Sequence, residues 1–221
     1  MQTTVITGAN RGIGLALCTL LKERGRQVIA ACRTSSPELD ALGVEVVAGA
    51  DVARDDGVAT LRDAVGTRRI ELLINNAGIL RWDDNLDTLD FEAVREQLEV
   101  NALGPLRVTQ ALRGSLVEGA KVAMITSRMG SITDNGSGAA YGYRMSKAAL
   151  NMASSTLALE LKKHGIALAI LHPGMVSTGM IGFQGQIEPD EAARGLLARI
   201  DALSLATSGG FWHQNGERLP W

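Results

Sequence analysis

Short apolar runs alternate with amphipathic segments along the whole chain. Six runs are almost continuously apolar, as strands covered on both faces must be: 3–8, 27–32, 44–51, 70–75, 121–127 and 166–174. Helical periodicity lies between them at 12–24, 56–65, 89–112, 143–163 and 189–201, and the ending GGFWHQNGERLPW indicates a last strand and a tail. The pattern predicts an α/β fold: a single doubly wound Rossmann-type domain with a seven-stranded, mostly parallel sheet.

The composition agrees with one buried domain and narrows the function. The chain has 221 residues, 46% of them hydrophobic, with 25 glycines and no break in composition, so residues 1–221 are expected to form one domain. A net charge of -2 gives no reason to expect nucleic acid or an anionic membrane as a partner. No apolar run approaches the roughly 20 residues of a membrane span, and no signal peptide is visible. We therefore expect a cytoplasmic protein.

The cysteines and histidines do not indicate a metal site. Cys18 and Cys32 lie in apolar surroundings, where buried and reduced thiols are expected. His164, His172 and His213 are far apart and lack the spacing of metal ligands. No metal is expected.

A glycine-rich turn follows the first predicted strand. In VITGANRGIG, Gly8 ends the strand, and Gly12 and Gly14 let backbone N–H groups and a helix N-terminus approach a phosphate closely. The spacing is G-x-x-x-G-x-G, and a merely structural turn is the alternative. We expect this turn to bind the pyrophosphate of a dinucleotide with Gly8, Asn10, Arg11, Gly12, Ile13 and Gly14.

The end of the second predicted strand bears on the choice between NADP and NAD. NAD-binding proteins usually carry an acidic residue there, which binds the adenosine ribose. The present sequence reads AACRTSS, with no carboxylate before Glu38. Arg33, joined by Arg11, would instead pair with a 2′-phosphate through charge-assisted hydrogen bonds. NADP (NADPH) is the expected cofactor and NAD the less favoured one; the alternative is that Arg33 is a solvated surface cation.

The segment YGYRMSK holds both tyrosines of the chain and a lysine. Tyr143 and Lys147 are four residues apart and share one face of a predicted helix. Tyr141 is six residues from Lys147, roughly 600° of helical turn, so it points elsewhere. A nearby ammonium stabilises phenolate and should lower the phenol pKa from roughly 10 toward the working pH. This pair is therefore a candidate for general acid/base catalysis; an ordinary half-buried phenol beside a solvated lysine is the alternative.

Six motifs occur in order: TGANRGIG, NNAG (75–78), the Asn of VNALGP (100–105), a Ser after the fifth strand, YRMSK (143–147) and HPGMVST (172–178). Together they resemble the short-chain dehydrogenase/reductase family over essentially the whole chain. The ending GGFWHQNGERLPW resembles the tail of the smaller carbonyl reductases similar to sniffer and to bacterial C-factor. The resemblance implies a nicotinamide-dependent oxidoreductase.

The resemblance also implies roles for individual residues. The catalytic tetrad would be Asn101, Ser127, Tyr143 and Lys147, with Lys147 also binding the nicotinamide ribose and Asn101 holding a water that relays protons. Asp51 would bind the adenine amino group, with Val52 beside it. The other implied cofactor contacts are Asn75, Ala77, Gly78, Pro173, Gly174, Val176 and Thr178. Taken alone, Asp51 fits a helix cap, Asn101 a kink before Gly104-Pro105, and Thr178 an N-cap.

The expected substrate is a small hydrophobic aldehyde or ketone. In this family the segment after HPGMVST is a substrate lid, and here it is short, which suggests an open site. Met175, Met180, Ile181 and Phe183 would offer apolar contact there, although core packing explains them equally well. The 16-residue gap from Ser127 to Tyr143 is longer than in many relatives, so the shape of the pocket is in doubt.

Two other functions compete with an NADPH-dependent carbonyl reductase. One is a dinucleotide-binding signalling protein with incidental turnover, which the C-factor resemblance suggests. The other is an NAD-dependent alcohol dehydrogenase, against which the missing acid after the second strand argues. By analogy with the family we expect a homodimer or homotetramer formed through the long helices, 89–112 and 143–163.

Overall fold

The computed structural model describes residues 3–221. Seven strands form one sheet in the order β3-β2-β1-β4-β5-β6-β7, and every ladder between them is parallel. The strands are β1 (Thr3–Thr7), β2 (Gln27–Ala31), β3 (Glu45–Val47), β4 (Ile70–Asn75), β5 (Leu116–Ile125), β6 (Ala167–His172) and β7 (Phe211–His213). The predicted doubly wound, seven-stranded sheet is confirmed, and its described strands are parallel throughout.

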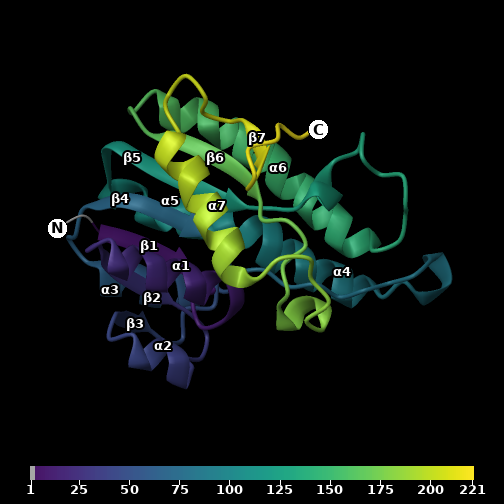
Figure 1. The fold of residues 1–221 in the computed structure, drawn as a ribbon, viewed down its shortest axis with the longest axis horizontal. Helices are drawn as coiled ribbons and strands as arrows, with labels where there is room; N and C mark the ends of the chain where they lie inside the picture. Colours follow the sequence, from purple (N-terminus) through teal and green to yellow (C-terminus); the bar gives the residue numbers. More distant parts are fainter. Residues whose placement is uncertain (1–2) are drawn as a thin grey trace.

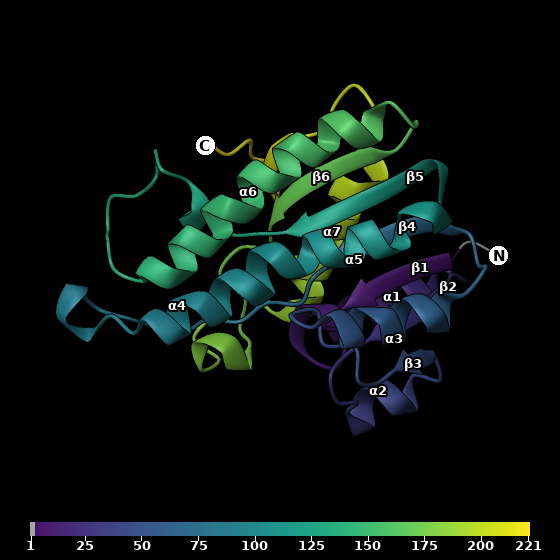
Figure 2. The same ribbon diagram turned by 180° about the vertical axis from the view of Figure 1, so that it is seen from behind.

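Helices cover both faces of the sheet. On one face lie α1 (Gly12–Glu23) and α7 (Pro189–Ala202) (Figure 1). On the other lie α3 (Asp55–Val65), α4 (Phe91–Leu98), α5 (Gly104–Leu112) and α6 (Tyr141–Lys162) (Figure 2). The short α2 (Pro37–Ala41) lies beside β3, at the edge of the sheet. The loops after β4, β5 and β6 all leave the sheet at the carboxyl ends of the strands, on the same side of the molecule.

The two faces of the sheet belong to two separate hydrophobic clusters. Along β1, Val5 belongs to the cluster beneath α3, α5 and α6, and Ile6 to the cluster beneath α1 and α7. Successive side chains of a strand point to opposite faces, so a strand that is covered twice must be apolar at consecutive positions. This is why the strands read as unbroken apolar runs.

The predicted helix 89–112 is interrupted. A π-helical turn, η2 (Glu99–Leu103), separates α4 from α5, and the N–H of Gly104 donates to the carbonyl of Glu99 across it. Pro105 follows and has no N–H to offer the helix. Turns of this kind are frequent at functional sites, and Asn101 lies inside this one.

Other differences from the predicted elements are small. The sequence analysis did not predict α2, although Ser36 caps it through an accepted hydrogen bond from the N–H of Leu39, and Pro37 begins it. The third strand is shorter than the predicted 44–51, and the fifth begins at Leu116 rather than at 121.

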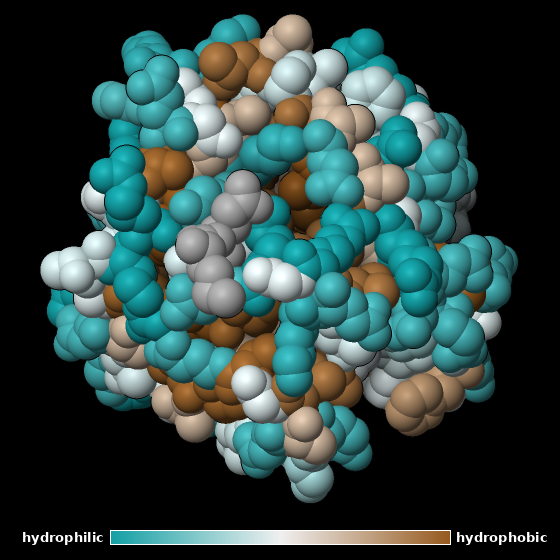
Figure 3. Space-filling model, turned by 60° about the vertical axis from the view of Figure 1, so that its left-hand side comes forward, coloured by the Kyte–Doolittle hydropathy of each residue, from teal (hydrophilic) through white to brown (hydrophobic). Residues whose placement is uncertain are grey.

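The strands begin at the end of the sheet that is opposite the motif residues. Figure 3 views the molecule from that side, where mostly hydrophilic side chains surround smaller hydrophobic patches.

Among residues 3–221 there is no helix with both the length and the apolar character to cross a bilayer.

Candidate active site

The glycine turn after β1 is shaped by close backbone contacts. Gly8 has a φ of +66°, and a Cβ at this position would lie 2.7 Å from the Cα of Ala77. A Cβ on Gly14 would lie 2.1 Å from the carbonyl oxygen of Gly8. Only glycine fits either position. The turn therefore brings the backbone and the N-terminus of α1 into a cradle without side chains, as pyrophosphate binding requires.

The two asparagines after β4 have different roles. Asn76 donates from Nδ2 to the carbonyl oxygens of Thr7 and Gly8, both at 3.1 Å, and so joins β4 to the glycine turn. Asn75 is buried, and its Nδ2 donates to Thr109 Oγ1 at 3.1 Å, toward α5. Asn75 was predicted to contact the cofactor and Asn76 was not. The buried Oδ1 of Asn75 has no hydrogen-bond partner among the described residues, and its cofactor contact stays a prediction.

Of the residues expected near the adenosine, Arg11 and Arg33 are exposed, Asp51 is half-buried and Val52 is buried. Neither arginine forms an ion pair within the described part of the chain. Asp51 accepts a hydrogen bond from the N–H of Ala53 at 3.0 Å; the N-cap of α3 is Arg54, so Asp51 is not the cap. Val52 packs where a side chain on Gly104 would otherwise lie.

Ser127, Tyr143 and Lys147 come together behind the carboxyl end of β5. Their exposed fractions are 7%, 9% and 4%. The Ser127 side chain lies near the Tyr143 phenol and favours its ionised form, which lowers the phenol pKa. The Nζ of Lys147 lies 5.7 Å from the centroid of the Tyr143 ring and donates to the carbonyl of Ile125 at 3.1 Å. The structure thus places the three predicted catalytic side chains side by side.

Lys147 has donors to spare. Its only hydrogen-bond partner within residues 3–221 is the carbonyl of Ile125, and an ammonium carries three N–H donors. The Nζ lies 3.6 Å from the position of a Cβ on Gly78, the last glycine of NNAG. Because an unpaired buried donor is costly, the spare N–H groups beside Gly78 fit the ribose hydroxyls of a dinucleotide.

Burial determines the protonation of the Tyr143–Lys147 pair. It raises the pKa of Tyr143 to about 12, and the nearby Ser127 side chain offsets only part of that effect. Burial also lowers the pKa of Lys147 to about 8. The expectation that the ammonium would lower the phenol pKa is therefore wrong for this structure, because desolvation of the phenolate outweighs the nearby cation.

Asn101 holds the segment that follows β4. Its Oδ1 accepts from the N–H of Ile79 at 2.8 Å, and its Nδ2 donates to the carbonyl of Ile79 at 2.8 Å and to Ser146 Oγ at 3.0 Å. The side chain is fully buried. Both amide N–H groups are thus used inside the protein, and the role of Asn101 in holding a water stays a prediction.

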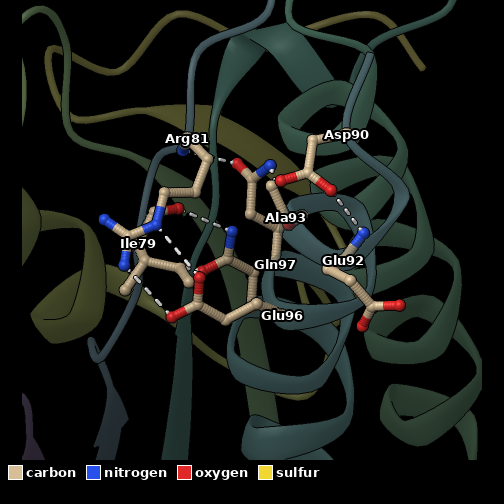
Figure 4. Close-up of polar contacts among 8 residues, drawn as sticks. Ile79, Arg81, Asp90, Glu92, Ala93, Glu96 and Gln97 are labelled. Carbon is tan, nitrogen blue, oxygen red and sulfur yellow. Dashed lines mark hydrogen bonds and ion pairs between the residues drawn. The ribbon is translucent and has the colours of Figure 1, made fainter.

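The same segment is fixed to α4 farther along. The N–H of Arg81 donates to Gln97 Oε1 at 2.9 Å, and the Arg81 guanidinium pairs with Glu96 at 3.0 Å (Figure 4). Asp90 caps α4 by accepting from the N–H of Glu92 at 2.8 Å. These contacts hold the segment after β4 against α4, beside the three catalytic candidates.

Asp83 caps the N-terminus of α6, although it lies far from this helix in the sequence. Its carboxylate accepts from the N–H groups of Tyr141 at 2.8 Å and Gly142 at 3.4 Å. Tyr141 is the first residue of α6 and is 43% exposed, whereas Tyr143 is buried. The two phenols therefore point to different surroundings, as their spacing predicts. The sequence analysis missed Asp83, and no local signal marks it.

Asn151 fixes the turn that carries Ser127. It accepts at Oδ1 from Thr126 Oγ1 at 2.7 Å and donates from Nδ2 to the carbonyl of Gly130 at 3.3 Å. Asn151 lies one helical turn beyond Lys147 on the same face. The spacing of residues 143, 147 and 151 marks this shared face in the sequence, and Asn151 was not predicted from it.

The residues of HPGMVST form a compact loop over the glycine turn. The N–H of Ser177 donates to the carbonyl of Ile187 at 2.8 Å, and Val176 bridges to Ile187. The Cγ2 of Thr178 lies 3.1 Å from the position of a Cβ on Gly12. Val176, Thr178 and the preceding Pro173 and Gly174 follow β6, and the turn with Asn10 and Ile13 follows β1, so both lie at the carboxyl end of the parallel sheet.

Two surface hollows lie away from this group. One, of about 440 Å³, is lined by residues 66–69 and 114–118 at the amino ends of β4 and β5. The other, of about 410 Å³, lies beside Arg54 and Arg107. Neither contains a catalytic candidate, so the motif residues and not the hollows locate the site.

Comparison with known proteins identifies the family. The family model for short chain dehydrogenases matches residues 2–188. The 1-hydroxy-2-glutathionyl-2-methyl-3-butene dehydrogenase of Rhodococcus sp. (strain AD45) is 41% identical over 227 residues, covering 100% of both chains. The C-signal of Myxococcus xanthus is 43% identical over 159 residues, covering 71% of this chain and 96% of that protein.

Solved structures agree over the full length. The NADPH-bound carbonyl reductase from chicken fatty liver superposes with a TM-score of 0.89 at 30% identity, covering 100% of this chain and 99% of that one. The carbonyl reductase Sniffer of D. melanogaster gives 0.89 at 27% identity, with 100% of both chains covered. The predicted family and its nicotinamide dinucleotide cofactor are thus supported by sequence and by fold. The chain is an oxidoreductase that belongs to the short-chain dehydrogenase/reductase family.

Proposed function

We propose that this protein is an NADPH-dependent carbonyl reductase that reduces small hydrophobic aldehydes or ketones, with Tyr143 as the proton donor. The observation that carries the proposal is the buried group of Ser127, Tyr143 and Lys147, with the Lys147 Nζ 5.7 Å from the centroid of the phenol ring. The bound nicotinamide supplies the hydride, and the chain supplies orientation and a proton.

Each catalytic side chain has a defined task in this proposal. The Ser127 hydroxyl donates to the substrate carbonyl oxygen and stabilises the negative charge that develops there. Tyr143 gives its phenol proton to the same oxygen. Lys147 binds the ribose through its spare N–H groups and stabilises the phenolate that remains. A water at the π-helical turn of Asn101 replaces the lost proton.

Burial keeps the Tyr143 phenol protonated near neutral pH, because it raises the pKa to about 12. The protonated phenol is the form that can give a proton to a carbonyl oxygen.

The test is oxidation of NADPH with a panel of aldehydes and ketones. Tyr143→Phe should lower kcat by roughly 10³-fold, within the range of general acid catalysis, while NADPH binding stays within about two-fold. Tyr141→Phe is the matched control and should leave kcat nearly unchanged, because Tyr141 lies on the outside of α6. The reverse behaviour of the two variants would reject the assignment.

The preference for NADPH rests on Arg11 and Arg33. Both residues are exposed, Arg11 in the glycine turn and Arg33 shortly after β2, and no acidic residue follows β2 before Glu38. Arg33→Ala should weaken NADPH binding by about ten-fold or more, as expected for a charge-assisted hydrogen bond, with little change for NADH. Equal losses for both cofactors, measured by fluorescence titration, would remove the argument.

Two relatives of this chain have names that indicate other functions. The 41% identical Rhodococcus protein acts, by its name, on an alcohol that carries a glutathionyl group. The panel should therefore include glutathionyl alcohols with NADP⁺ and NAD⁺. The 43% identity to the Myxococcus C-signal supports the signalling alternative, which NADPH binding without turnover of any compound would favour.

We also propose that two copies associate through α4 and α6. Met145, Met152 and Leu159 recur every seven residues along α6 and are 51%, 70% and 70% exposed. An apolar stripe of this spacing is typical of a helix that packs against a partner. Sedimentation should show a dimer or tetramer that Met152→Glu weakens; a monomeric wild-type protein would reject the proposal.

A further inference from the structure

The loop between Ser127 and Tyr143 ends in an unfavourable backbone conformation. Gly138, Ala139 and Ala140 have φ values of +65°, +53° and +49°. Residues with a Cβ rarely adopt this left-handed region, and consecutive ones are rarer. Ala140 is also the N-cap of α6, and its methyl side chain offers the helix no cap. Other groups must hold this conformation.

Asp83 holds the start of α6, since its carbonyl also accepts from the N–H of Ala140 at 2.8 Å, and Arg144 holds the residues before it. Its Nε donates to the carbonyls of Gly138 at 3.0 Å and Ala139 at 3.1 Å, and its Nη2 to Ser137 Oγ at 2.8 Å. Its Nη1 reaches the carbonyl of Met129 at 3.5 Å, across the mouth of the loop. The rigid fork of a guanidinium suits several carbonyls at once.

All of these acceptors are uncharged. No acidic side chain forms an ion pair with Arg144 among residues 3–221. A second arginine, Arg128, holds the middle of the loop through Asp134 at 2.9 Å and reaches Glu217 in the C-terminal segment at 2.6 Å. Arg144 thus contacts the two ends of the loop, and Arg128 contacts its middle.

The ends of this loop carry the reacting hydroxyls. Met129 is two residues after Ser127, and Arg144 directly follows Tyr143. We infer that Arg144 is a positioning residue of the active site, which keeps the Ser127 and Tyr143 hydroxyls in place relative to each other by tying Met129 and Ala139 to the first turn of α6. The inference rests on the proposed reductase function.

The experiment compares Arg144→Met, Arg144→Lys and wild type with NADPH and a carbonyl substrate. Met keeps the apolar stem and removes the fork. Arg144→Met should lower kcat by 10- to 100-fold and raise KM for the carbonyl, while the Kd for NADPH stays within two-fold. Arg144→Lys should recover part of kcat, and added guanidinium ion should rescue an Arg144→Ala variant, because it restores the lost donors.

The matched control is Arg62→Met. Arg62 is exposed and pairs with Asp63 on the surface of α3, so its loss should leave kcat unchanged. A kcat for folded Arg144→Met within two-fold of wild type would overturn the inference. So would parallel losses of kcat and NADPH affinity without guanidinium rescue, because these indicate a general structural defect.

Amide hydrogen exchange keeps the inference testable if the wild-type protein reduces no carbonyl. That result would reject the proposed function alone. Arg144→Met should then speed exchange at residues 129–143 by at least ten-fold, with exchange in β4 and β5 unchanged. Uniform acceleration over the whole chain, or no acceleration in the loop, would overturn the positioning role.

Discussion

The turn after β1 and the turn after β5 both carry residues of the site, but they are held in opposite ways. The first, residues 8–14, is shaped by glycines whose neighbours leave no room for a Cβ. The second, residues 127–140, keeps two alanines at positive φ and depends on the side chains of Arg128, Arg144 and Asn151.

The two turns therefore depend on the sequence in different ways. Local backbone geometry specifies the glycine turn after β1, so it can be recognised in a stretch of seven residues. The turn after β5 depends on polar side chains that come from α6 and the C-terminal segment. Substitutions should therefore act through steric clash in the first turn and through lost support in the second.

The largest expected effect tests the steric side of this comparison. Gly14→Ala places a Cβ 2.1 Å from a backbone oxygen that has no freedom to move aside, so it should cost about 3 kcal/mol or more of unfolding free energy. Urea unfolding measures the loss. Gly114→Ala is the control: a Cβ there meets nothing within 4 Å. Similar losses in both variants would contradict the steric argument.

The next effect concerns the lysine between the two turns. Because the pKa of Lys147 falls from 10.5 to about 8 on folding, the penalty of burying its charge is fully present below pH 8 and is relieved as pH rises toward 10.5. The unfolding free energy of wild type, relative to Lys147→Met, should therefore rise by about 2 to 3 kcal/mol from pH 7.5 to 10.

Denaturant unfolding across that pH range provides the measurement. It stops at pH 10, because the stabilising effect of the raised Tyr143 pKa begins to be lost as pH increases from 10 toward 12. Exposed Lys162 is the control for removing one positive charge from α6. A difference between wild type and Lys147→Met that does not change with pH would show that the charge is not buried.

The smallest expected effect concerns the strained backbone of the turn after β5. Ala139→Gly should stabilise the protein by about 0.5 kcal/mol, because relief of the left-handed conformation exceeds the added entropy of the unfolded chain. Ala153→Gly in the middle of α6 should destabilise it by about 1 kcal/mol. Thermal unfolding distinguishes the two signs. Destabilisation by both would mean that the backbone at 139 is not strained.

The same contrast explains what could be predicted from the sequence. The strands, the glycine turn and the pairing of Tyr143 with Lys147 follow from periodicity and local spacing. Asp83 was missed because its contact with Tyr141 spans 58 positions. The direction of the Tyr143 pKa was wrong because it depends on burial, which spacing alone does not report. The long third strand was overpredicted because its residues are apolar beyond the end of the ladder.

The division of the interior by the sheet has a thermodynamic consequence. Leu17 belongs to the cluster beneath α1 and α7, and Leu112 to the cluster on the opposite face. Cavities that share no neighbours contribute independently to the unfolding free energy, whereas cavities in one cluster couple. The costs of Leu17→Ala and Leu112→Ala are therefore expected to be additive, so the face that carries the catalytic helix can change its packing while the other keeps its own.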